Sequence, residues 1–106
     1  MVIIDTSLLM ERVGDGKIIN EAVTFITVIE YPMILEYGKF HGKIFYPDMQ
    51  DFILALKIQG KLRKVGRMKG ASDLVIAAIC INNNERLSTI DDDFNDIADV
   101  SNLGLV

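Results

Sequence analysis

Apolar and polar residues follow one another in blocks that predict strands and helices in turn. A short apolar run over residues 2–4 and a short segment over 87–90 predict central strands, and each ends at an aspartate, Asp5 and Asp91 respectively. The other predicted elements are an apolar, β-rich stretch over 22–29, extended segments over 44–46 and 100–106, and helices over 8–13, 30–37, 49–64, 73–81 and 93–98. Strands that alternate with helices predict an α/β fold with parallel pairing.

The boundaries of three helices follow from capping and helix-breaking residues. Asp48 is a suitable N-cap for the helix over 49–64, which has an apolar face and a lysine-rich face. Gly38 is a natural stop for the helix over 30–37. Ser72 is the expected N-cap of the next helix, whose uninterrupted apolar run over 74–81 predicts a buried helix.

Length and composition limit the class of protein. A chain of 106 residues with 50% hydrophobic and 25% charged residues predicts one folded domain over residues 1–106 and excludes a disordered chain. The single cysteine, Cys80, excludes an intramolecular disulfide and a cysteine-built zinc site, and there is one histidine, His41. The longest apolar run is far shorter than the about 20 residues that span a bilayer, and the first residues lack a basic region. We therefore expect a cytoplasmic protein with no membrane partner.

Charge is unevenly distributed along a chain whose net charge is −4. Six of the eleven basic residues lie between Lys57 and Lys69, and six of the fifteen acids lie between Glu85 and Asp99. An acidic cluster that collects a cation, next to a basic stretch, is an arrangement that can bind a polyanion.

Four acids border strongly apolar sequence: Asp5, Glu30, Asp73 and Asp91. Lone buried carboxylates are costly and clustered carboxylates repel one another, and a hard divalent cation resolves both problems. Ligands that are oxygen only, without cysteine or histidine, point to Mg²⁺ or Mn²⁺. The alternative is that each acid is a separate helix cap or surface residue, but four acids at matching element ends favour a shared metal site.

Four blocks of sequence carry a resemblance to a known family. They read Val2-Ile3-Ile4-Asp5-Thr6-Ser7, Thr24-Phe25-Ile26-Thr27-Val28-Ile29-Glu30, Ala71-Ser72-Asp73-Leu74-Val75-Ile76-Ala77-Ala78 and Leu87-Ser88-Thr89-Ile90-Asp91-Asp92-Asp93-Phe94. In this order, over nearly the whole chain, they resemble the PIN domain family of metal-dependent ribonucleases, which includes the VapC toxins of VapBC toxin–antitoxin modules.

The resemblance implies a fold, an activity and a site. The fold is a three-layer α/β/α sandwich around a central, mostly parallel sheet. The activity is endonucleolytic cleavage of RNA by metal-activated water, and the implied partners are RNA, a VapB-like antitoxin and a second copy of the chain. The residues that carry it are the catalytic and metal-binding acids Asp5, Glu30, Asp73 and Asp91, the auxiliary acid Asp93, the supporting hydroxyls of Thr6 and Thr89, and the RNA-contacting residues Lys61, Lys64, Arg67 and Lys69.

Two departures from the family pattern stand out. The 25-residue step from Asp5 to Glu30 is shorter than the family usually has, so we expect a trimmed helix there. Ile90 replaces an arginine that usually precedes the last acid, which removes a cation from the site. Neither departure touches the four acids.

Other functions were weighed on the same residues. An EF-hand loop that starts at Asp91 is rejected, because its sixth and twelfth positions hold Asp96 and Asn102 instead of Gly and Glu. A Mg²⁺-binding receiver-like signalling domain needs adjacent acids after the first strand, yet Thr6 and Ser7 follow Asp5. A non-catalytic or RNA-processing interaction domain stays open, because an intact set of acids does not establish turnover. The basic stretch is equally compatible with a solvated helix face.

Overall fold

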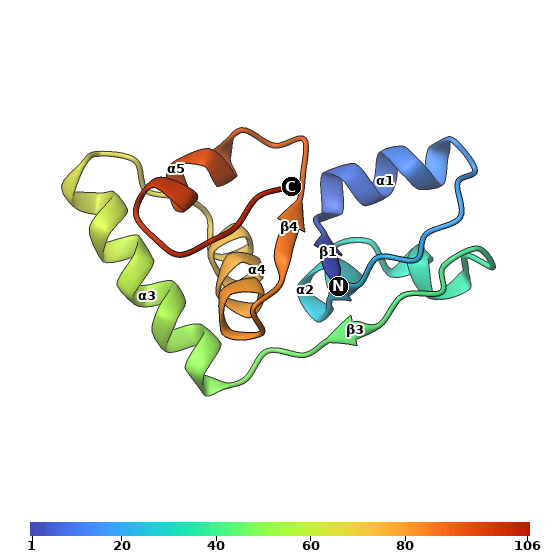
Figure 1. Cartoon of the computed structure of the whole chain (residues 1–106), viewed down its shortest axis with the longest axis horizontal. Helices are drawn as coiled ribbons and strands as arrows, with labels where there is room; N and C mark the ends of the chain where they lie inside the picture. The colour runs from blue at the N-terminus through green and yellow to red at the C-terminus, as the bar shows by residue number, and fades with distance from the viewer.

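The computed structural model describes the whole chain, from Met1 to Val106 (Figure 1). Its elements in chain order are β1 (Val2–Ile4), α1 (Thr6–Gly14), β2 (Val23–Thr24), α2 (Phe25–Glu30), the 3₁₀ helix η1 (Pro32–Glu36), β3 (Ile44–Phe45), α3 (Met49–Lys64), α4 (Ala71–Asn82), β4 (Arg86–Ser88) and α5 (Asp93–Asp99). Every helix is too short or too polar to span a bilayer.

The strands form two small parallel sheets. In one, β1 pairs with β4 and Ile3 lies opposite Leu87, and in the other, β2 pairs with β3. An isolated bridge between Ile3 and Ala22 joins the two sheets, and another joins Leu87 to Leu105. Because β1 and β4 run in the same direction, the residues that follow them emerge at the same edge.

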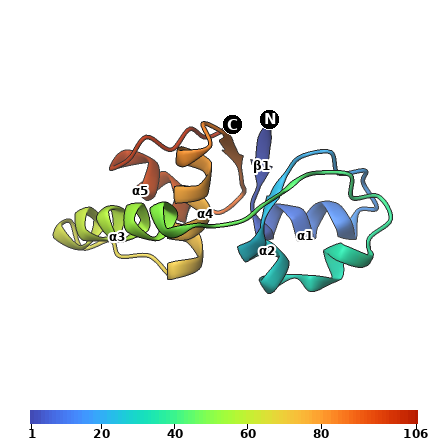
Figure 2. The ribbon, with the colours of Figure 1, turned by 90° about the horizontal axis from the view of Figure 1, so that it is seen from below.

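The predicted three-layer sandwich around a central sheet is wrong. The strands are only two or three residues long, and they form two pairs joined by the single bridge at Ile3 and no wide middle layer. Helices α3, α4 and α5 lie to one side of β1 along the long axis, and α1 lies to the other (Figures 1 and 2).

The two sheets are small because two segments that were predicted to be extended contribute little to them. The apolar stretch over 22–29 folds mostly as helix α2, because the hydroxyl of Thr24 accepts a hydrogen bond from the Thr27 amide and caps the helix. The segment over 100–106 contributes only the single bridge at Leu105. At 25–29 local hydrogen bonding outweighs the β-branched composition on which the prediction rested.

Of three further helix boundaries predicted from the sequence, one agrees with the structure and two differ. Helix α3 begins after Asp48, which forms a capping box with Asp51, as the N-cap prediction requires. The predicted helix over 30–37 is instead the 3₁₀ helix η1, whose first residue is Pro32. The N-cap position of helix α4 is held by Gly70, which has no side chain to cap the helix, instead of by the predicted Ser72.

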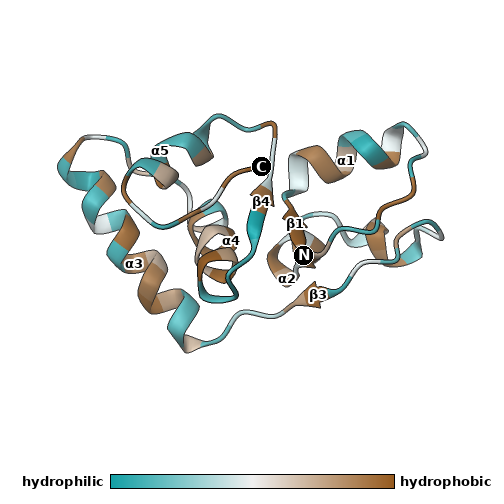
Figure 3. Cartoon of the chain, viewed as in Figure 1, coloured by the Kyte–Doolittle hydropathy of each residue, from teal (hydrophilic) through white to brown (hydrophobic).

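The two sides of β1 face two hydrophobic cores. Ile3 packs into the larger core with the buried face of α4, and Ile4 packs into the smaller core with Leu9 of α1. Seven consecutive residues of α4, from Leu74 to Cys80, are buried, and Figure 3 shows that helix as the most hydrophobic. Burial raises the pKa of the Cys80 thiol to about 12, so this cysteine is a core residue.

Candidate metal centre

The four predicted acids line one cavity. Asp5 directly follows β1, Asp91 lies three residues beyond β4, Glu30 ends α2, and Asp73 lies in the first turn of α4. The cavity has a volume of about 230 Å³, and its lining residues are Asp5, Thr6, Ser7, Met10, Glu30, Asp73, Ile76 and Asp91. Four segments that are far apart in the sequence therefore bring their carboxylates to one place.

Asp5 is the most rigidly held of these acids. Its side chain is 3% exposed, and one carboxylate oxygen accepts a hydrogen bond of 3.1 Å from the Leu8 amide, which makes Asp5 the N-cap of α1. The other oxygen accepts hydrogen bonds from the hydroxyls of Ser7, at 2.9 Å, and Thr89, at 2.7 Å. These hydrogen bonds to the charged form compensate for burial of the carboxylate.

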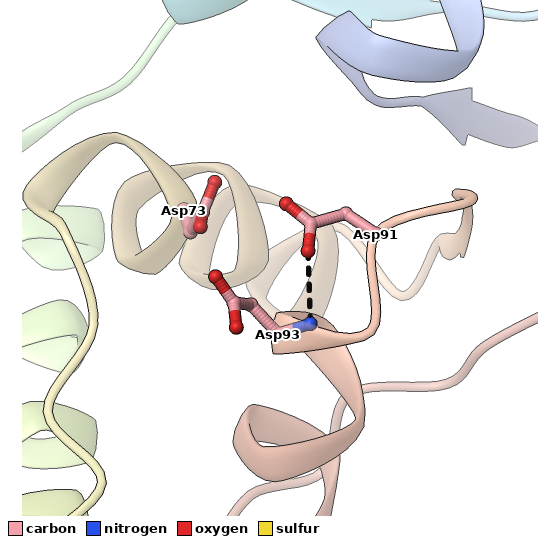
Figure 4. Close-up of side chains that lie close together, drawn as sticks. All are labelled: Asp73, Asp91 and Asp93. Carbon is pink, nitrogen blue, oxygen red and sulfur yellow. Dashed lines mark hydrogen bonds between the residues drawn. The ribbon is translucent and has the colours of Figure 1, made fainter.

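Thr89 connects Asp5 to the acids that follow β4. While its hydroxyl donates to Asp5, the same oxygen accepts a hydrogen bond of 2.9 Å from the Asp91 amide. The Asp93 amide in turn donates to the Asp91 carboxylate at 2.9 Å, as Figure 4 shows. The ends of β1 and β4 are thus joined through side chains, and the loop that carries Asp91 is fixed.

Three carboxylates crowd together on one side of the cavity. One oxygen each of Asp73, Asp91 and Asp93 lie within 4.8 Å of one another, and their side chains point toward a common space (Figure 4). Burial, reinforced by the charges of Asp91, Asp93, Glu30 and Asp5, raises the pKa of Asp73 to about 6. An all-oxygen donor set with this excess of negative charge suits Mg²⁺ or Mn²⁺.

Glu30 lies in the cavity but outside this group of three carboxylates. The Thr6 hydroxyl donates a hydrogen bond of 2.7 Å to one Glu30 oxygen, and it also lies 2.9 Å from the Thr27 hydroxyl. Thr6 therefore orients Glu30 across the gap between α1 and α2, and its predicted supporting role in the site stays a prediction.

The raised pKa of Asp73 predicts a pH dependence of stability in the metal-free protein. Because the folded-state pKa of about 6 lies above the ordinary aspartate value of 3.8, the folded state binds the proton more tightly than the unfolded state. The contribution of Asp73 to the free energy of unfolding is therefore largest below pH 3.8 and falls as the pH rises through about 6. Urea unfolding in EDTA between these pH values measures it.

The matched variant for this pH series is Asp73→Asn, which removes the titrating group. The difference in stability between the wild type and Asp73→Asn is expected to move in favour of the wild type as the pH falls below about 6. A difference that stays constant across this range would contradict the burial and charge crowding assigned to Asp73.

The four basic residues predicted to contact RNA fall into two separate groups. Arg67 and Lys69 pair with Asp96, and Lys69 also pairs with Asp93, so these two lie next to the acids. Lys61 and Lys64 instead line a larger groove of about 920 Å³ between α3 and the segment after α5. Contact of any of these residues with RNA stays a prediction.

Two residues at the site have contacts that the sequence reading did not assign. The Ser7 hydroxyl holds Asp5, and a hydroxyl two positions after an acid at a helix start is the only signal that could have indicated this. The Lys69 ammonium lies 2.8 Å from Asp96, and this hydrogen bond raises the pKa of Lys69 and lowers that of Asp96. No sequence spacing predicts that partnership, because it depends on how the loop before α4 meets α5.

Comparison with known proteins gives a likeness of fold only. The sequence matches no protein-family model and no curated protein. Solved structures do match it. The chain resembles one in the crystal structure of VapBC2 from Rickettsia felis bound to a DNA fragment from their promoter, with a TM-score of 0.79 at 17% identity, covering 100% of this chain and 98% of that one.

Two further solved structures match over the whole chain. The structure of VapBC-1 from nontypeable Haemophilus influenzae matches with a TM-score of 0.75 at 21% identity and coverage of 100% and 97% of the two chains. FitAcB from Neisseria gonorrhoeae matches with a TM-score of 0.73 at 20% identity and coverage of 99% and 96%. At such identities the likeness establishes the fold shared with these chains.

The identification of the chain as a VapC-like toxin of the PIN domain family is corrected by these comparisons. No family model matches the sequence, and the matched structures are two-component assemblies at low identity. The shared fold does not assign this chain to one component or the other.

Proposed function

We propose that the chain is a divalent-metal-dependent endoribonuclease that hydrolyses phosphodiester bonds of RNA. The observation that supports it is the convergence of Asp5, Glu30, Asp73 and Asp91 on one cavity, with three carboxylate oxygens, those of Asp73, Asp91 and Asp93, within 4.8 Å of one another. Phosphodiester hydrolysis needs stabilisation of negative charge that builds up on the phosphate, and an acidic site of this kind meets that need by collecting a cation.

The residues of the site have separate tasks in this proposal. Asp73 and Asp91, with Asp5 and Glu30 beside them, would hold Mg²⁺ or Mn²⁺. When bound, the ion supplies a Lewis acid that lowers the pKa of a water and stabilises charge on the phosphate. The hydroxyls of Ser7 and Thr89 keep the Asp5 carboxylate oriented, and the Thr6 hydroxyl does the same for Glu30.

Basic residues near the acids support a phosphate substrate. The Arg67 side chain is 57% exposed while it contacts Asp96, so its guanidinium is accessible beside the acidic cavity. Guanidinium groups bind phosphate with two parallel hydrogen bonds. We assign Arg67 to the RNA backbone in this proposal, and Lys61 and Lys64 to a more distant part of the same strand.

We also propose that the chain works as one component of a toxin–antitoxin pair. Support comes from the fold that it shares with chains of the VapBC and FitAcB structures. Apolar side chains near Glu30 add to it, since Ile29, Met33 and Leu35 are each about two-thirds exposed. A protein partner could bury these exposed apolar residues, which follow one another closely in the chain around Glu30.

The predicted homodimer stays a prediction within this proposal. Helix α3 has an exposed apolar surface that suits a subunit contact, in which Phe52 is 50% exposed and Leu56 is 74% exposed. Figure 3 shows that part of α3 is coloured as hydrophobic.

The experiment that tests the nuclease is cleavage of a structured RNA by the purified chain. We expect cleavage with Mn²⁺ and no cleavage with EDTA, because the carboxylates by themselves offer no Lewis acid to stabilise the negative charge that builds up on the phosphate. Cleavage that persists in EDTA would contradict the proposal. An absence of cleavage by a chain that binds Mn²⁺ would instead favour the non-catalytic interaction domain.

A further inference from the structure

Lys69 is fixed in the loop between α3 and α4 by a side chain from α3. The Gln59 amide nitrogen donates a hydrogen bond of 2.6 Å to the Lys69 carbonyl, and the Gln59 amide oxygen accepts one of 3.1 Å from the Lys69 amide. The backbone of Lys69 is therefore held from both sides, which determines where its side chain can reach.

The side chain of Lys69 extends to the acids of α5. It is 13% exposed, and its ammonium lies 2.8 Å from an Asp96 oxygen and 3.4 Å from an Asp93 oxygen. Asp93 is also one of the three carboxylates that crowd together with Asp73 and Asp91. One positive charge of the protein thus already occupies the outer side of the acidic group.

We propose that Lys69 is a resident cation of the acidic site, which holds Asp93 and Asp96 and so limits the site to one divalent ion at Asp73 and Asp91. This inference rests on the proposed metal site, and it assigns Asp93 to Lys69 in preference to the ion. Lys69 acts as a positioning residue, since it contacts the acids and not the ion's expected ligands Asp73 and Asp91.

The physical reason is competition between two cations for the same carboxylates. Two-metal nuclease sites hold their ions about 4 Å apart and need shared carboxylates between them. Here Asp93 is the acid that a second ion would share, and the ammonium of Lys69 already neutralises it. A second dication would also be repelled by the fixed charge of Lys69 at short range.

Counting bound Mn²⁺ by titration calorimetry tests the inference without any RNA. We expect one ion per chain in the wild type and two in Lys69→Gln, with the first ion bound on the order of tenfold more tightly because one nearby positive charge is gone. Asp93→Asn in the Lys69→Gln background is expected to return the count to one, which shows that the second ion needs the carboxylate that Lys69 had occupied.

Two controls separate the position of Lys69 from the total charge. Lys69→Arg keeps a cation at the same place, and Arg67→Gln removes a positive charge that contacts Asp96 but not Asp93, so both are expected to bind one ion. Two ions in the wild type, one ion in Lys69→Gln, or two ions in Arg67→Gln would each overturn the inference.

The same titration distinguishes this inference from the proposed function. If the wild type binds no Mn²⁺, the proposed metal site is contradicted, and with it both the proposed nuclease activity and the inference about Lys69. A wild type that binds one ion but leaves RNA intact contradicts the nuclease alone, and the Lys69 variants then still decide the inference. Circular dichroism of each variant verifies that the chain is folded before ions are counted.

Discussion

Replacing Asp5 by asparagine is expected to reduce RNA cleavage by at least about a hundredfold, the scale at which loss of one preorganised electrostatic group affects a reaction. The carboxylate is 3% exposed and receives hydrogen bonds from Ser7 and Thr89, so it has a single orientation toward the cavity. An asparagine is nearly the same size and keeps an oxygen for the Leu8 amide, so α1 stays capped. What is lost is the negative charge offered to the cation, together with the oxygen that accepts hydrogen bonds from the Ser7 and Thr89 hydroxyls.

The matched control for Asp5→Asn is Asp48→Asn. Asp48 is also an aspartate N-cap, it accepts hydrogen bonds from the first turn of α3, and it is not among the residues that line the acidic cavity. Initial rates on a fluorescent RNA with Mn²⁺ should therefore be near the wild-type value for Asp48→Asn and far below it for Asp5→Asn. Equal cleavage by the wild type and Asp5→Asn would show that a contaminating nuclease is responsible, and the assignment of Asp5 would fail.

Mn²⁺ is expected to raise the melting temperature of the wild type strongly. The carboxylate oxygens of Asp73, Asp91 and Asp93 lie within 4.8 Å of one another in the folded state, where they repel one another. The unfolded chain does not bring them together. An ion that binds the folded state alone, at a hundredfold excess over its dissociation constant, adds about 2.7 kcal/mol to the free energy of unfolding. For a domain of this size that corresponds to an increase on the order of 10 °C.

Differential scanning fluorimetry with Asp91→Asn and Asp99→Asn tests the origin of this shift. Asp91 lines the acidic cavity, whereas Asp99 lies at the end of α5 beside the groove that contains Lys61. The Mn²⁺-dependent increase should be largely lost in Asp91→Asn and unchanged in Asp99→Asn. If both variants kept the full increase, the ion would be bound elsewhere on this acidic chain.

The acidic site could be anticipated because its signals are local. An aspartate directly after a β-branched run, as at Asp5, needs no knowledge of the rest of the chain to be noticed, and the same holds for Asp73 at the start of an apolar helix. Parallel pairing of the strands then brings Asp5 and Asp91 to one edge. The structure places all four predicted acids in one cavity, while their roles in metal binding and catalysis remain to be measured.

The sandwich and the family assignment did not follow from the same signals. β-branched residues such as those at 26–29 favour strands only when neighbouring strands are there to receive them, and here the cap at Thr24 starts a helix instead. The four blocks that carried the family resemblance are also short, so they say nothing about the sequence of most of the chain. Their shared order suggested a family that no comparison of the whole sequence supports.

The sequence by itself determined the elements whose signals lie within one or two turns: the strand that ends at Asp5, the helix capped by Asp48, the buried helix over 74–81, and the acids at their ends. Only the tertiary structure decided which of the charges meet, namely that Thr89 holds Asp5 and that Lys69 reaches Asp93 and Asp96. The physical reason is range. Capping and periodicity act between neighbours in the chain, whereas these contacts join residues 84, 24 and 27 positions apart, and their geometry depends on how two cores pack on either face of one short strand.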